Sequence, residues 1–226
     1  MAKTTYKTIT LDKAKLAVKV YNEGMYGCVK NPDLDERARL MFAGGLGKTP
    51  SEIESQVYFI GKDYGGVAGR PAALSFAPDV ARDIAANREQ FEQAVRSAQP
   101  ILIQVPRRST VAILYAPFVK RLVDANRVTS NWQVWGTKFW FWLNQRAFPM
   151  EDSRVNEFFL ITDENSVDKY LKFADRFRDF VVGHQDWVPE LRKVDDGSDS
   201  QPCSDNKLWD KMCYGLADLE KYSAAS

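Results

Sequence analysis

The stretch WQVWGTKFWFWLNQRAFPMEDSRV, residues 132–155, decides the fold class of this chain. Apolar and aromatic side chains dominate its first part, which predicts a helix over residues 132–145. Gly136 allows a turn or a close approach, and Lys138 then opens an almost wholly apolar helical run. A connector containing Pro149 follows, and Asp152 stands at the N-cap position of a second predicted helix over residues 153–161. Two helices joined by a short connector are therefore expected here.

The same helical spacing of apolar residues recurs along most of the chain. It predicts further helices over residues 11–21, 35–43, 79–97, 109–126, 166–182 and 205–222, of which 79–97 is charged and largely exposed. Pro117 is expected to bend or split the helix over 109–126. Another helix begins at a capping box, with Thr49 as N-cap, Pro50 at the first helical position and Glu52 reaching back. Residues 61–78 and 195–205 are predicted loops, and residues 101–105 a short strand or an extended segment. With at most one strand among many helices, the sequence predicts an all-α fold.

Length and composition indicate a globular chain. It has 226 residues, of which 45% are hydrophobic and 27% charged. We expect one helical domain over residues 1–226; if it divides into lobes around a cleft, they are residues 1–105 and 106–226. The net charge is only +1, so binding to nucleic acid would depend on a local basic face rather than on overall charge.

Several kinds of chemistry have little support in the sequence. Cys28, Cys203 and Cys213 are unevenly spaced and His184 is the sole histidine, so we expect no metal and no cofactor. Residues 44–49, GGLGKT, resemble a phosphate-binding loop, but Phe42 stands where that motif has glycine, and a helix start explains the segment. The polar N-terminus and the absence of an apolar run of about 20 residues predict a cytoplasmic protein that does not enter a membrane.

Lys138 and Asp152 form the strongest candidate for a chemical site. Because they come from adjoining helices joined by a short connector, their side chains can face one cleft. An ammonium beside much aromatic surface loses hydration, which favours the neutral, nucleophilic amine. An amine with a nearby carboxylate suits displacement at a glycosidic carbon, where positive charge develops. A purely structural interpretation remains open, with Asp152 as an ordinary N-cap and Lys138 extending to water from the edge of an apolar face.

This stretch resembles the helix–hairpin–helix DNA glycosylase superfamily, including the 8-oxoguanine glycosylases and their divergent bacterial and phage relatives. In that superfamily a Gly-Thr-Lys or Ser-Lys opens a helix and a proline-containing loop delivers an aspartate at the next helix start. The resemblance covers residues 136–155 and implies that Lys138 is a Schiff-base nucleophile and Asp152 the catalytic carboxylate. The usual hairpin Leu-Pro-Gly-Val-Gly is absent, since Gln133-Val134-Trp135-Gly136 stands in its place, and the spacing from lysine to aspartate is shorter.

The resemblance implies DNA as the partner and base flipping as the mode of access. The residues expected to contact the base or the DNA are Trp135, Gly136, Thr137, Arg154, Arg107 and Arg108. We therefore expect a monomeric DNA glycosylase that acts on a damaged or modified base, including phage-type hypermodified bases. One alternative is a phage transferase of the same fold that adds a group to an activated thymine. The other is a helical binding module without catalysis.

Overall fold

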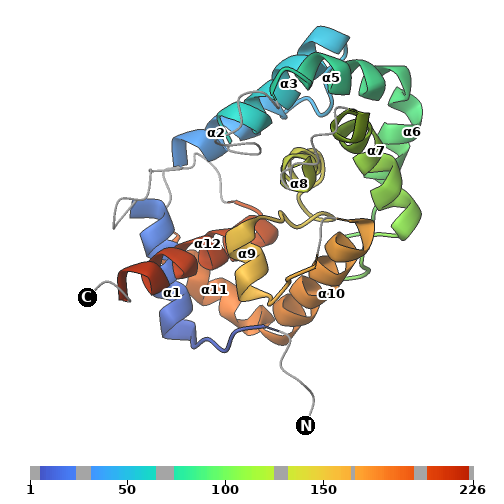
Figure 1. Ribbon diagram of the computed structural model, residues 1–226. Coiled ribbons are helices and arrows are strands. Elements are labelled where there is room, and N and C mark those ends of the chain that lie inside the picture. Colours follow the sequence, from blue (N-terminus) through green and yellow to red (C-terminus); the bar gives the residue numbers. More distant parts are fainter. Residues whose placement is uncertain are drawn as a thin grey trace.

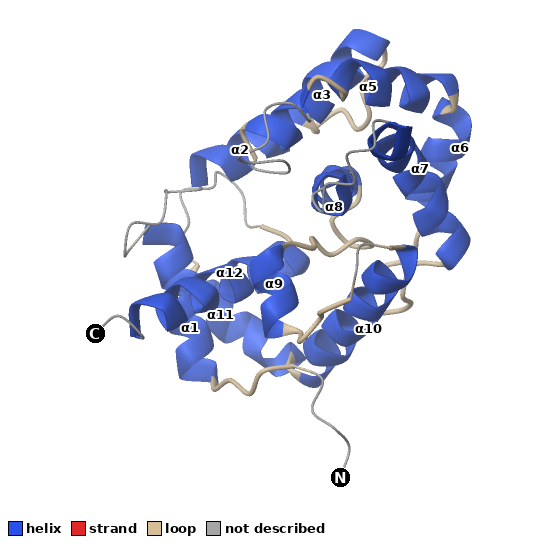
Figure 2. Cartoon of the chain, viewed as in Figure 1, coloured by secondary structure: helices blue, strands red, loops and turns tan. Residues whose placement is uncertain are grey.

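Helices form the whole regular structure of the described residues. The computed structural model describes residues 6–23, 32–64, 74–124, 132–163, 166–195 and 203–223. Every regular element within these ranges is a helix, as Figures 1 and 2 show. The all-α fold class is therefore confirmed. None of the helices in these ranges is long and apolar enough to cross a membrane.

The helices gather in two groups on opposite sides of α8 (Trp132–Leu143) in Figure 1. One group holds α2 (Pro32–Met41), α3 (Pro50–Lys62), α5 (Ala77–Ala86), α6 (Arg88–Ser97) and α7 (Arg108–Asp124). The other holds α1 (Leu11–Glu23), α9 (Ser153–Phe158), α10 (Val167–Gly183), the short 3-10 helix η2 (Gln185–Trp187), α11 (Val188–Val194) and α12 (Asp205–Ser223). These two groups do not correspond to lobes divided at residue 105. Helix α1 comes before that residue but packs on α12, and α7 comes after it but packs on α6 as well as on α8.

The aromatic helix α8 is buried over most of its described length, as its largely apolar sequence requires. Phe139 packs against Phe42, which follows α2, with ring centroids 5.4 Å apart, and Trp140 contacts Tyr170 of α10 at 5.7 Å. Gly136 lies within the helix rather than at a turn. The expected close approach is confirmed, because an added Cβ would lie 3.2 Å from Tyr115 and from Trp140.

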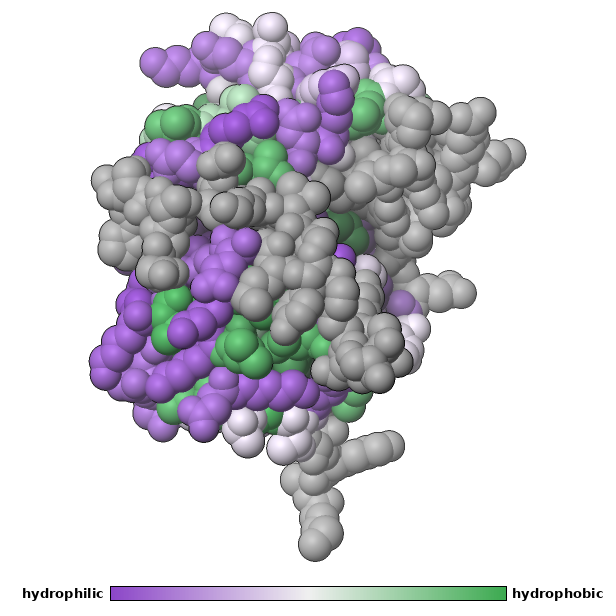
Figure 3. Space-filling model, turned by 90° about the vertical axis from the view of Figure 1, so that its left-hand side faces the viewer, coloured by the Kyte–Doolittle hydropathy of each residue, from purple (hydrophilic) through white to green (hydrophobic). Residues whose placement is uncertain are grey.

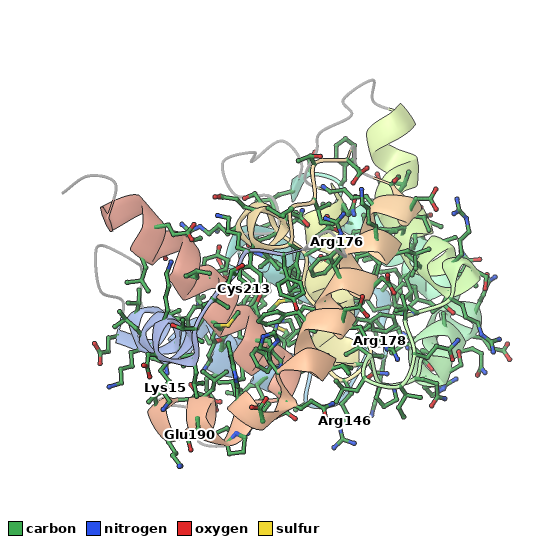
Figure 4. All side chains as sticks on the ribbon, turned by 90° about the horizontal axis from the view of Figure 1, so that it is seen from below. Lys15, Arg146, Arg176, Arg178, Glu190 and Cys213 are labelled. Carbon is green, nitrogen blue, oxygen red and sulfur yellow. The ribbon has the colours of Figure 1, made fainter. Side chains whose placement is uncertain are left out.

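Helices α1 and α12, the first and the last of the described helices, pack against each other. Their backbones meet at Gly215, where a Cβ would lie only 1.9 Å from the carbonyl oxygen of Ala17. Lys15 of α1 also forms a 3.1 Å ion pair with Glu190 of α11, and the two residues lie at the same edge in Figure 4. On the face drawn in Figure 3, hydrophilic residues cover much of the described surface and hydrophobic ones form smaller patches.

Two expectations for residues 79–97, that they form a single helix and that it is largely exposed, are wrong. Residues 79–97 form two helices, α5 and α6, which meet at Asn87, where the side-chain amide donates to the carbonyl of Asp83 and the backbone leaves the helical conformation. Their inner faces are buried, including Ile84 and Phe91. Pro117 does not split its helix, because it lies within the continuous α7. Burial of flanking side chains such as Phe118 outweighs the one lost hydrogen bond.

Residues 101–103 form a turn rather than a strand. The amides of Ile103 and Gln104 donate to the carbonyl of Pro100, as in a helical turn. The spacing of apolar residues does not predict η2 or α11. The expected loops at 61–78 and 195–205 are described only at their margins, and helix α3 extends into the first of them, to Lys62.

The start of α3 confirms the predicted capping box. Thr49 Oγ1 accepts from the Glu52 amide at 3.2 Å, while Glu52 Oε2 accepts from the Thr49 amide at 2.9 Å. The amide of Lys48 also donates to Glu52, and that of Gly47 donates to Gln56. Because these side chains already occupy the loop amides that a phosphate would need, the segment is a helix start.

We expect Thr49→Ala to lower the free energy of unfolding by about 1 kcal/mol, because the variant leaves an amide of the first turn without its cap. Urea unfolding followed by circular dichroism measures this. Thr49→Ser, which keeps the hydroxyl, serves as the control and should stay close to the wild type. An unchanged midpoint for Thr49→Ala would contradict the capping role.

Candidate active site

A pocket of about 260 Å³ lies where α8, α12, the end of α1 and the residues after α3 meet. This volume is close to the lower end of the usual range for small-molecule sites, roughly 300–1,000 Å³. Its lining combines five charged residues with aromatic and apolar ones. The charged residues are Asp63, Lys138, Asp152, Lys207 and Asp210, and the others are Tyr21, Leu34, Tyr64, Met150 and Tyr214.

Lys138 and Asp152 both line this pocket, which confirms that they face one cavity. Lys138 Nζ lies 3.7 Å from Asp152 Oδ2, and the two side chains are only 8% and 10% exposed. Lys138 also donates to the carbonyl oxygen of Tyr64 at 3.3 Å. The lysine lies in the second half of α8 and does not open the helix, since α8 begins at Trp132. Its burial shows that it does not extend to bulk water.

Asp152 is at once the N-cap of α9 and a wall of the pocket. Its Oδ1 accepts from the amides of Arg154 at 2.8 Å and Val155 at 3.2 Å. These two bonds fix the carboxylate at the positive end of a helix, where a negative charge is stabilised. The other oxygen, Oδ2, faces Lys138. The structural and the chemical interpretation of Asp152 are therefore compatible, because each uses a different oxygen.

Lys207 lies at the centre of a buried cluster that the sequence did not single out. Its ammonium lies 2.8 Å from Asp210 Oδ2 and 3.1 Å from Asp35 Oδ1, and donates to the hydroxyls of Tyr21 and Tyr64, each at 3.0 Å. The lysine side chain is 3% exposed. Burial alone would lower the pKa of Lys207, but the charges of Asp210 and Asp35 outweigh it and raise that pKa well above its usual range. Lys207 is therefore an ammonium and not a nucleophile.

This cluster, here called the Lys207 cluster (Tyr21, Asp35, Tyr64, Lys207 and Asp210), joins four segments of the chain. Tyr21 comes from α1, Asp35 from α2, Tyr64 from the residues after α3, and Lys207 with Asp210 from α12. Burial raises the pKa of both tyrosines well above the usual value, and the nearby Asp35 raises it further. Both hydroxyls therefore keep their protons and donate hydrogen bonds to Asp35.

The segment Gly136–Thr137 and its neighbour Trp135 support the site from behind and do not line the pocket. Trp135 is 1% exposed, and its indole donates to the carbonyl of Val57 at 2.9 Å. The hydroxyl of Thr137 donates to the carbonyl of Glu151 at 3.2 Å and accepts from the Glu151 amide at 3.3 Å. The structure thus gives Trp135 and Thr137 positions in the core, where they hold α8 against the connector that carries Asp152.

Glu151 anchors that connector in a second buried network. Its carboxylate lies 3.2 Å from Lys169 Nζ and accepts from Asn156 at 2.9 Å and from the side chain of Gln133. Burial raises the pKa of this carboxyl, and Lys169 opposes the rise. Gln133, which stands where the superfamily has its hairpin, lies in the first turn of α8 and here fixes the residue before Asp152.

The three arginines expected to contact DNA have different surroundings. Arg154 lies beside the pocket, with its guanidinium 4.4 Å from the ring centroid of Tyr214 and paired with Asp218 at 2.8 Å. Arg108 opens α7, where it is paired with Asp168, and Arg107 is exposed just before it. Neither Arg107 nor Arg108 lines the pocket.

The described residues give no metal-binding arrangement. Within them, no group of three or more His, Cys, Asp or Glu side chains is placed to hold a metal ion. Cys203 and Cys213 are free thiols, and burial raises the pKa of Cys203 to about 12, which makes it unreactive. Cys28 lies outside the described residues.

No family model, curated protein or solved structure matches the chain. The chemistry of the site must therefore be inferred from its geometry. The site combines the ion pair of Lys138 and Asp152, a second carboxylate at Asp210 and aromatic side chains in one small pocket. Such a pocket can orient a flat group and stabilise positive charge beside Asp152.

Proposed function

We propose that this chain is a DNA glycosylase-like enzyme that takes a damaged or modified base into the pocket and cleaves its N-glycosidic bond. The meeting of Lys138 and Asp152 in one pocket, 3.7 Å apart and nearly buried, carries this proposal. The resemblance of residues 136–155 to the helix–hairpin–helix glycosylases supports it, as does the all-helical fold. DNA is the proposed partner.

The proposed role of Asp152 follows from its fixed orientation. Cleavage of an N-glycosidic bond builds positive charge on the sugar, and a carboxylate held in place before the reaction stabilises that charge without reorganisation. The two amides on Oδ1 provide this rigidity, and Oδ2 remains turned to the pocket. Low exposure strengthens the effect, because little water screens the charge.

Lys138 is the proposed nucleophile. Once its proton has passed to solvent, its free amine attacks the sugar carbon, the bond between sugar and base breaks, and the electron pair leaves with the base. A water molecule can take the same place, in which case Lys138 acts only in binding. Aromatic rings of Tyr64 and Tyr214 provide surfaces for a flipped base, and Arg154 beside them is the proposed phosphate contact.

We expect Asp152→Asn to slow base release by about 10²–10³-fold, the usual effect of removing one preorganised electrostatic group. Asparagine caps a helix about as well as aspartate, but it leaves the nearly buried ammonium of Lys138 without its carboxylate, so the thermal unfolding midpoint should fall and the rates are compared at a temperature where both proteins are folded. The rate is measured as free base released from duplex and single-stranded DNA under single-turnover conditions. An unchanged rate would exclude the catalytic role of Asp152.

The role of Lys138 is tested in the same assay by borohydride, which traps a Schiff base as a covalent adduct. The adduct should form with the wild type and disappear in Lys138→Gln. The matched control is the exposed pair Lys172 and Asp163, whose charged atoms lie 2.8 Å apart. Lys172→Gln and Asp163→Asn remove equivalent charges outside the pocket and should leave release and trapping intact. Base release without any adduct would assign the attack to water.

A further inference from the structure

Asp210 lies in the pocket with no role in the chemistry described so far. It comes one turn after Lys207 on α12 and lines the same cavity as Asp152 and Lys138. Its side chain is only 8% exposed. Its Oδ2 accepts a 2.8 Å hydrogen bond from the Lys207 ammonium, which favours the ionised carboxylate. The pocket therefore holds a buried negative charge besides that of Asp152.

The Lys207 cluster contains more negative than positive charge. Its one ammonium lies between two carboxylates, 3.1 Å from Asp35 and 2.8 Å from Asp210. The tyrosines of the cluster keep their protons and add no positive charge. One carboxylate charge is therefore left without a matching cation. Because an uncompensated charge is costly inside a protein, a positively polarised group of a ligand would be bound favourably here.

The hydrogen bonds of the cluster place this excess on Asp210. Asp35 accepts from Tyr21 on Oδ2 and from Tyr64 on Oδ1, so both of its oxygens are used, and it does not line the pocket. Asp210 uses only Oδ2, on Lys207. Its Oδ1 accepts no hydrogen bond from the described residues and is not among their fully enclosed unpaired atoms. Since Asp210 lines the pocket, Oδ1 is a charged acceptor open to the cavity.

The positive charge of the cluster is not open to a ligand in the same way. The Lys207 ammonium has three N–H groups, and it donates to Tyr21, Tyr64 and Asp210. All three are therefore used within the protein. The cluster presents an acceptor to the cavity without a free donor from its lysine, which favours ligands with N–H groups over ligands with carbonyl oxygens.

We propose that Asp210 selects the substrate base, with Oδ1 accepting a hydrogen bond from an amino group that the base carries on its ring or as an ammonium group on a side arm. This inference rests on the proposed function and names the substrate class that it leaves open. Lys138 and Asp152 act at the sugar, while Asp210 recognises the base. A carbonyl oxygen in the same place would oppose two acceptors and leave the charge of Asp210 without a partner.

The first test measures binding of free bases, which requires no cleavage. Adenine and hypoxanthine differ by an amino group against a carbonyl, and 5-aminomethyluracil and thymine differ by an ammonium group. In nuclear magnetic resonance titrations of the wild type, the amino member of a pair should bind about 10–100-fold more tightly, the effect of one hydrogen bond to a charged group. A preference in the first pair indicates a ring amino group, and one in the second an ammonium arm. Equal affinities within both pairs, or no binding of any base, would overturn the proposal.

Asp210→Asn tests which residue makes the selection. Asparagine has the same shape but no charge, and its amide can donate as well as accept, so the preference for amino bases should disappear. The variant should fold, because Lys207 keeps Asp35 and both tyrosine hydroxyls as partners, and circular dichroism checks this. A folded variant that keeps the wild-type preference would show that Asp210 does not recognise the base.

The matched control is Asp195→Asn. Asp195 is also a buried carboxylate, 2.9 Å from Lys211 of α12, but it does not line the pocket. This variant should keep the wild-type preference, and loss of the preference here as well would contradict a specific role for Asp210.

Base release from DNA separates this inference from the proposed function. If release needs Asp152 while Asp210→Asn binds all four bases like the wild type, the role of Asp210 alone is overturned. If amino bases are preferred through Asp210 while no DNA substrate loses a base, recognition by Asp210 stands and the proposed cleavage fails.

Discussion

Replacing Lys207 by methionine is expected to lower the free energy of unfolding by about 3–5 kcal/mol, the usual cost of removing one partner from a buried ion pair. Methionine fills a similar volume but leaves Asp35 and Asp210, which are 4% and 8% exposed, without a positive charge between them. Urea unfolding at neutral pH, followed by circular dichroism, measures the loss.

The loss should shrink as pH falls. Without Lys207 the two carboxyls become harder to ionise in the folded state than in the unfolded one, so folding takes up protons. In the variant, this proton uptake stabilises the fold at pH values below the carboxyl pKa of the unfolded chain. The stabilisation is lost as pH rises through the higher carboxyl pKa of the folded chain. Lys172→Met, in an exposed pair, should cost about 1 kcal/mol or less. An equally small effect for Lys207→Met would show that the cluster does not stabilise the fold.

Gly215→Ala is expected to separate the helices α1 and α12, with a loss of about 3 kcal/mol or more in stability. The new Cβ would lie 1.9 Å from the carbonyl oxygen of Ala17 and 2.7 Å from its carbon, and both are backbone atoms that no rotamer change can move. Because Tyr21 follows on the same helix α1, the floor of the pocket should be disturbed as well.

Differential scanning calorimetry measures this effect, and Gly183→Ala provides the matched control. Gly183 ends α10, and an added Cβ there meets nothing within 4 Å. Its replacement should change the midpoint little, while Gly215→Ala lowers it by several degrees or prevents folding. Similar midpoints for the two variants would contradict the close contact between α1 and α12.

Elements of the fold that depend on local chemistry could be predicted from the sequence. Thr49, Pro50 and Glu52 specify a helix start within four residues, and the aromatic run around Trp140 specifies a buried helix. The break between α5 and α6 depends on the hydrogen bond from the Asn87 side chain to the backbone, which competes with the helix. The periodicity of apolar residues does not predict such a break. The pairing of α1 with α12 joins the first and the last of the described helices, and no local pattern indicates it.

The candidate site likewise contains residues that could be paired from the sequence and residues that could not. Lys138 and Asp152 could be paired from the sequence because a short connector limits how far apart they can lie. Lys207 and Asp35 are far apart in sequence and meet only in the tertiary structure. The local sequence shows only that two polar residues, Lys207 and Asp210, lie near the apolar face of a predicted helix. Ordinary surface residues show the same pattern, so it does not indicate a buried cluster.

Mass spectrometry of DNA after incubation with the wild-type chain tests the central claim most directly. The panel should hold damaged and hypermodified bases in duplex and single-stranded DNA, with Asp152→Asn run in parallel. We predict a free base in the supernatant, with a matching loss of that base from the DNA, and neither change with Asp152→Asn on the same timescale. A base that gains mass while it stays in the DNA would instead indicate a transferase. No change in any substrate, from a chain that is folded, would contradict the assignment of this pocket to base excision.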